Sequence, residues 1–181
     1  MTRAVAFVTC LAIVSVNLAA QSHPDLTGDW VLDKAKTAAL TDAKTGPAQG
    51  ASGGAAVAGG GTMSPGAAVT VEYQITVAAA TMTIERLGLP TPQKYIYKLD
   101  GSESVNTVGT ATTHTKSHWV GATLVTEGTR SFPTSQGTVR ISTRDVRSLD
   151  KDGAMVVEMT TQVEGQGASK TYQVFVKKSK S

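Results

Sequence analysis

The chain has 181 residues, of which 40% are hydrophobic, 17% charged and 5% aromatic. This composition is too apolar for a disordered chain, and the length suits one modest domain. The 17 basic and 14 acidic residues leave a formal net charge of +3. The one basic cluster, Lys177, Lys178 and Lys180, is expected to be a solvated chain end. We therefore predict no nucleic-acid partner, because such a partner needs many basic residues gathered on one face.

Residues 1–20 have the layout of a secretory signal peptide. Arg3 supplies a positive start, Ala4–Leu18 carries no charge, and two small residues, Ala19 and Ala20, precede a polar stretch. The apolar run is shorter than the about 20 residues of a spanning helix, so no integral membrane span is expected. We predict cleavage near Ala20 and a secreted or periplasmic protein.

The single cysteine, Cys10, lies within this removable segment. Lipoprotein anchoring at Cys10 is an alternative, but the preceding Phe7-Val8-Thr9 is a poor match for it. After cleavage the protein has no disulfide and no thiolate ligand for a metal.

Residues 21–42 are predicted to form an N-terminal segment with the first strand. Trp30 and Leu32 fall on one face of that strand, because side chains alternate with a period of two. Asp33–Ala39 is expected to form one helical turn.

Residues 43–69 differ sharply in composition. They are rich in glycine and alanine, contain prolines at 47 and 65, and hold almost no large apolar side chain. Such a segment cannot bury enough surface to offset its ordering entropy. We predict a flexible insert here.

Residues 70–178 show a strong period of two that predicts a β-meander, forming one domain with residues 26–37. Apolar and aromatic side chains alternate with polar ones in six runs, namely 71–77, 81–85, 94–99, 139–142, 155–162 and 171–176. Glycine-containing turns separate most runs, the clearest being Asp150–Gly153. The pattern predicts an all-β fold of about eight antiparallel strands. An up-and-down barrel, which has no exposed edges, is the first choice, and an open antiparallel sheet or sandwich is the second.

Several motifs in this order resemble a known group of proteins. They are Leu26–Thr37 with its Gly28-Asp29-Trp30 triplet, Tyr97–Gly101, Trp119–Val125, Arg147–Gly153 and Tyr172–Lys178. Together they are similar to secreted bacterial proteins of unassigned function with a lipocalin-like barrel. The resemblance covers residues 26–37 and roughly 70–178, and it implies a barrel architecture.

A barrel of about eight strands is either filled by side chains or holds one small ligand. If it holds a ligand, inward side chains should line a cavity of roughly a few hundred Å³. The candidate ligand-binding residues are Trp30, Tyr73, Ile84, Tyr97, Trp119 and Met159.

Catalytic and metal sites are not expected. His114 and His118 are four residues apart, which spans about 13 Å along a strand and is too far for one ion. Acyl-transfer chemistry is not expected either, because the histidines stand among threonine and lysine residues. Arg140 and Arg144 share one face of a strand and Arg147 takes the other, which leaves open a basic stripe for an anion or simply a polar outer face.

The function predicted from the sequence is a secreted or periplasmic module that binds a small apolar ligand, with no cofactor and no enzymatic activity. The alternative is an envelope or extracellular structural or interaction domain with a filled barrel. The sequence does not specify the oligomeric state.

Overall fold

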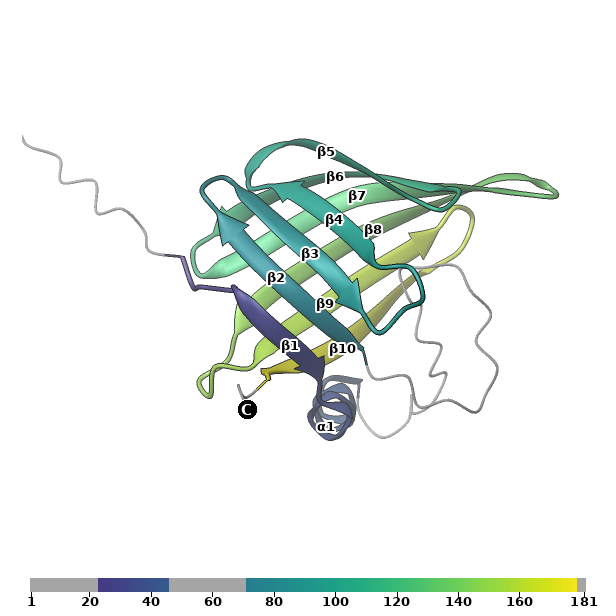
Figure 1. Ribbon diagram of the computed structural model, residues 1–181. Coiled ribbons are helices and arrows are strands. Elements are labelled where there is room, and N and C mark those ends of the chain that lie inside the picture. Colours follow the sequence, from purple (N-terminus) through teal and green to yellow (C-terminus); the bar gives the residue numbers. More distant parts are fainter. Residues whose placement is uncertain (1–22, 46–70, 179–181) are drawn as a thin grey trace, which may run out of the picture.

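In the computed structural model, residues 23–45 and 71–178 are described, and they form one α-helix and ten β-strands (Figure 1). The elements are β1 (Gly28–Leu32), α1 (Lys34–Thr45), β2 (Glu72–Ala78), β3 (Thr81–Leu87), β4 (Gln93–Lys98), β5 (Asp100–Val108), β6 (Ala111–Val120), β7 (Thr123–Thr134), β8 (Gly137–Leu149), β9 (Met155–Val163) and β10 (Ala168–Lys177). The predicted signal peptide at 1–20 lies outside the described residues. In the described part of the chain, no helix has the length and apolar character needed to cross a membrane.

The strands form one antiparallel sheet that curls into a nearly closed barrel. Its order is β4-β3-β2-β1-β10-β9-β8-β7-β6-β5, so consecutive strands pair with one another except β4 and β5, which stand at the two ends of the order. β1 pairs with both β2 and β10 and so joins the start of the meander to its end. The predicted all-β, up-and-down barrel is confirmed, with ten strands where about eight were expected.

β5 is one of the strands that the alternation did not reveal. Its buried residues are Ser104 and Asn106, so no apolar rhythm marks it. The predicted turn at Asp100-Gly101 lies at the start of this strand, and Gly109, with φ of 60°, makes the tight turn into β6. A strand whose inward side chains are polar shows no apolar alternation, so its sequence resembles that of a loop.

Trp30 anchors the closed end of the barrel. It is fully buried, together with Leu26 and Phe175, and its indole Nε1 donates a hydrogen bond to the Leu26 carbonyl at 2.9 Å. The Lys177 ammonium lies 5.3 Å from the centre of the Trp30 ring, within cation–π distance. Lys177 is otherwise exposed, as predicted for a solvated chain end, and Lys178 pairs with Glu72 at 3.1 Å.

The helix is longer than the single turn expected at Asp33–Ala39. α1 runs for 12 residues and begins at a capping residue, Asp33, whose carboxylate accepts a hydrogen bond from the Lys36 backbone at 2.9 Å. The Thr37 hydroxyl accepts the Val174 backbone N–H at 2.9 Å, which seats α1 on β10 beyond the end of β1. Residues 43–45, which composition assigned to the flexible insert, are the last part of α1, and residues 46–69 lie outside the described residues.

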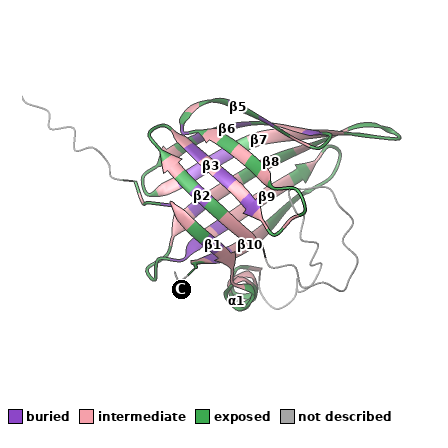
Figure 2. Cartoon of the chain, viewed as in Figure 1, coloured by how far each residue is buried: buried purple, intermediate pink, exposed green. Residues whose placement is uncertain are grey.

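Burial follows the predicted alternation. Figure 2 shows buried and intermediate positions alternating along β3, and exposed positions alternating with less exposed ones along β2. In β3, Met82, Ile84 and Arg86 are buried while the residues between them are half-exposed. The fully buried apolar side chains, Trp30 among them, form one core cluster inside the barrel.

Gly128 is a test of how tightly β6 and β7 pack. It pairs with Thr115, and a Cβ at Gly128 would overlap the His114 carbonyl oxygen and lie 2.9 Å from the Thr115 Cα. We expect Gly128→Ala to lower the free energy of unfolding by about 1–3 kcal/mol, because backbone must move to make room. Urea denaturation followed by tryptophan fluorescence measures this change.

Gly167→Ala is the matched control, since a Cβ at Gly167 meets nothing within 4 Å. Its unfolding free energy should stay within about 0.5 kcal/mol of the parent. Equal effects of the two substitutions would contradict the close approach of β6 to β7.

Candidate ligand-binding cavity

The barrel encloses a cavity of about 170 Å³. Its wall is built by inward side chains of nine strands, β2 to β10, and combines an apolar floor with polar groups. The apolar and aromatic lining residues are Tyr73, Ile75, Ile84, Tyr95, Tyr97, Val108, Ala111, Ile141, Met155, Val157, Met159 and Phe175. The polar ones are Arg86, Thr113, Thr115, Thr126, Arg130, Thr143, Asp145, Arg147, Thr161 and Gln173.

Four of the six predicted ligand-binding residues lie on this wall. They are Tyr73, Ile84, Tyr97 and Met159, brought from β2, β3, β4 and β9. Their contact with a ligand stays a prediction. The cavity itself is smaller than the few hundred Å³ that the sequence led us to expect.

The two tryptophans do not line the cavity. Trp30 belongs to the packed core at the closed end. The ring of Trp119 is stacked on His23, with ring centres 4.5 Å apart and planes 4° from parallel, and His23 Nδ1 lies 3.2 Å from the Gly121 carbonyl oxygen. Both tryptophans therefore have structural partners.

Charged side chains inside the barrel were missed by sequence reasoning. Arg86, Arg130 and Arg147 line the cavity against a single acidic residue, Asp145, so the lining carries a formal charge of 3 − 1 = +2. Arg147 is only 8% exposed. The alternation already placed Arg147 on the face opposite Arg140, which is the signal that could have found it.

The guanidinium of Arg147 has one hydrogen-bond partner and one buried nitrogen without a partner. Its Nη2 donates to the Asp145 carboxylate at 2.9 Å, while its Nη1 is buried without a hydrogen-bond partner. Burial by itself lowers the pKa of Arg147, but attraction by Asp145 and the hydrogen bond to it raise that pKa above its usual value. The cavity is thus lined by a permanently charged guanidinium. Its Nη1 is a hydrogen-bond donor that has no acceptor.

The polar groups around Arg147 add neutral donors and acceptors. Burial raises the pKa of the Tyr73, Tyr95 and Tyr97 phenols, so all three stay protonated at neutral pH. The Thr115 hydroxyl is buried and has no partner either. Buried polar atoms are nearly always hydrogen-bonded, so these atoms favour a cavity whose occupant carries polar groups.

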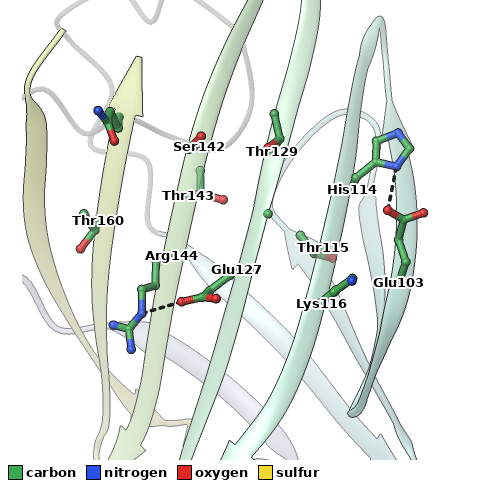
Figure 3. A pocket seen from close by; sticks show the side chains of 12 residues that line it. Glu103, His114, Thr115, Lys116, Glu127, Thr129, Ser142, Thr143, Arg144 and Thr160 are labelled. Carbon is green, nitrogen blue, oxygen red and sulfur yellow. Dashed lines mark hydrogen bonds and ion pairs between the residues drawn. The ribbon is translucent and has the colours of Figure 1, made fainter. Parts of the chain in front are cut away.

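A second hollow lies on the outer face of the sheet (Figure 3). It measures about 510 Å³ and is lined by residues of β5 to β9, of which Thr115 and Thr143 also line the interior cavity. Both of its carboxylates already have a basic neighbour: Arg144 donates to Glu127 at 2.9 Å, and His114 lies 3.4 Å from Glu103. Because these side chains are half-exposed and already have partners, the smaller interior cavity is the stronger candidate site.

Metal binding finds no support among the described residues. His114 and His118 lie on a strand, β6, as predicted. Within 23–45 and 71–178, no three His, Cys, Asp or Glu side chains are close enough to hold one ion.

Comparisons with known proteins identify the fold. No family model and no curated protein sequence matches the chain. Among solved structures it is similar to the REP1-NXSQ fatty acid transporter, with a TM-score of 0.50 and 13% identity over 86% of this chain and 98% of that one. It is also similar to apo lipid binding protein 8 of Caenorhabditis elegans, with a TM-score of 0.50 and 12% identity over 84% and 94% of the two chains. Likeness at this identity shows a shared fold.

Asp145 tests the electrostatics of the cavity. We expect Asp145→Ala to lower the free energy of unfolding by roughly 3–5 kcal/mol, because it leaves the buried Arg147 charge without a counter-ion. Glu127→Ala is the control: it breaks a pair of the same 2.9 Å length on the exposed face and should cost at most about 1 kcal/mol. Equal losses in denaturant titrations would show that Arg147 is solvated.

Proposed function

We propose that this chain binds a small, largely apolar molecule that carries one acidic group, inside the barrel. The observation that carries the proposal is the buried guanidinium of Arg147, whose Nη1 has no partner within an otherwise mostly apolar cavity. An acid oxygen of the ligand would accept this hydrogen bond. The apolar part of the ligand would lie against side chains such as Ile84 and Met159.

Electrostatics support an acid over a neutral or basic ligand. A buried charge is costly unless it is paired and fully hydrogen-bonded, and Asp145 satisfies only one edge of Arg147. Arg86 and Arg130 add positive charge to the same lining. An anionic head group lowers this repulsion, whereas a cationic ligand increases it.

The solved structures of similar fold are consistent with this class of ligand. One is titled a fatty acid transporter and the other a lipid binding protein. A fatty acid is an apolar chain with one carboxylate, which is the chemistry that the Arg147 side of the cavity favours. The alternative of an interaction domain with a filled barrel fits less well, since the interior holds a void of about 170 Å³. We infer a carrier and expect no catalysis.

We further propose that the protein is secreted or periplasmic and belongs with the secreted bacterial barrel proteins that it resembles. The charge, apolar run and small residues of 1–20 support export and cleavage. N-terminal sequencing of the exported protein should read from Gln21. A chain that begins at Met1 in the exported fraction would contradict this proposal.

Ligand binding is tested first on the protein as its host produces it. Extraction with organic solvent and mass spectrometry should release an acidic, apolar molecule at near one equivalent per chain. Absence of any bound molecule, together with no binding of long-chain carboxylic acids by the purified protein, would contradict the carrier function.

A variant pair then isolates the role of the charge. Asp145→Leu/Arg147→Met removes the whole buried ion pair and leaves an apolar wall. We expect this double variant to bind hexadecanoate roughly tenfold to a hundredfold more weakly, since a hydrogen bond to a charged group contributes about 1.5–3 kcal/mol. Binding of the neutral hexadecanol should change little. Calorimetric titration measures both, and Arg140→Met, on the outer face of β8, is the control.

A further inference from the structure

One line of the barrel wall has no backbone ladder. β4 and β5 follow each other in the chain, yet they stand at the two ends of the sheet order, and no backbone register joins them. Figure 1 shows them as the two edges of the sheet on the same side of the barrel. Every other line between neighbouring strands is a ladder, from Leu124–Arg147 to Thr134–Gly137 in the longest case.

Side chains replace the ladder along this line, which we call the seam. The Asn106 amide accepts from the Ile96 backbone N–H at 2.7 Å and donates to the Ile96 carbonyl at 2.9 Å. The Ser104 hydroxyl accepts from the Lys98 backbone N–H at 2.8 Å. The side-chain amide of Asn106 thus stands in for a backbone peptide and satisfies both polar groups of Ile96.

The seam is also part of the cavity wall. Tyr95 and Tyr97 of β4 and Val108 of β5 line the cavity from its two sides. Two apolar side chains flank it on the outside, Ile96 at 48% exposure and Val105 at 54%. Opening the seam would therefore add directly to the cavity volume.

The size of the cavity makes such an addition necessary. A volume of about 170 Å³ is below the about 300 Å³ at which sites for ligands of moderate size begin. Widening a ladder breaks paired backbone groups along its whole length, whereas parting β4 from β5 breaks the bonds of Asn106 and Ser104. We therefore expect β4 and β5 to separate before any pair of strands that a backbone ladder joins.

We propose that the seam is the expansion joint of the barrel: the bridge made by Asn106 and Ser104 opens so that the cavity can hold a ligand larger than its resting volume. This inference rests on the proposed function. It gives the chain a size-dependent response, in which short ligands bind without seam opening and long ligands require it.

The test compares octanoate with hexadecanoate in a protein whose seam can be locked. In the full chain, Cys10→Ser removes the native thiol, and Ile96→Cys with Val105→Cys places one exposed thiol on each side of the seam. A short bis-maleimide joins them, and the same protein before cross-linking is the control. We expect the lock to weaken hexadecanoate binding about tenfold or more while octanoate changes less than about twofold.

The outcomes separate the two proposals. Hexadecanoate binding that is equal before and after cross-linking overturns the expansion joint and leaves the carrier function standing. An equal loss for both acids also overturns it, because size would then be irrelevant. Failure of the uncross-linked protein to bind either acid overturns the carrier function itself, and the joint with it.

Hydrogen exchange gives a second measurement that needs no ligand. The amides of Ile96 and Lys98 face the seam, whereas those of Tyr95 and Tyr97 face β3, because backbone N–H groups alternate along a strand. We expect Ser104→Ala to speed exchange at Lys98 at least about tenfold. Ser102→Ala, which removes a hydroxyl bonded only to Asp100 in the same strand, should not. Equal exchange at Lys98 in the two variants would overturn the seam's role as the yielding line.

Discussion

The pairing of β1 with both β2 and β10 joins the two halves of the sheet, and the interior exists because of it. Trp30 occupies the centre of this joint, opposite Tyr73 on one side and Lys177 on the other. Without β1, both of its neighbours would present unpaired backbone edges, and the strands would have no common inside. The indole ring fills the closed end while its N–H is satisfied by Leu26, so a large apolar body is buried with no polar atom left over.

The interior combines apolar and charged side chains. Phe175 and Leu124 are fully buried and apolar. Arg147, which stands opposite Leu124 in the β7–β8 ladder, and Arg86 are buried charges that line the cavity. Burying a guanidinium costs free energy, which the apolar core must offset. A fold that needed only stability would place apolar side chains at these positions, so the charges point to a role in recognition.

Much of this architecture follows from the period of two in the sequence. That rhythm correctly turned Tyr73, Ile84, Tyr97 and Met159 toward the inside, because one face of each strand is buried and the register permits no slip. It also turned Arg147 inward, but residue type argued for the surface, since arginine is rarely buried. Its partner Asp145 lies two residues away on the same face of β8, so the pair is local in the sequence and the alternation could have found it.

The period of two does not predict β5, and the physical reason for this also concerns the cavity. Its inward positions hold Ser104 and Asn106, whose side chains bond to the backbone of β4 and pack no core. Counting this strand raises the total to ten, and barrel diameter grows with strand number. About eight strands can be filled by side chains, whereas ten enclose a wider interior, in which a void remains beside core residues such as Ile75 and Met155. The polar strand therefore contributes to both the void and the one line of its wall that lacks a backbone ladder.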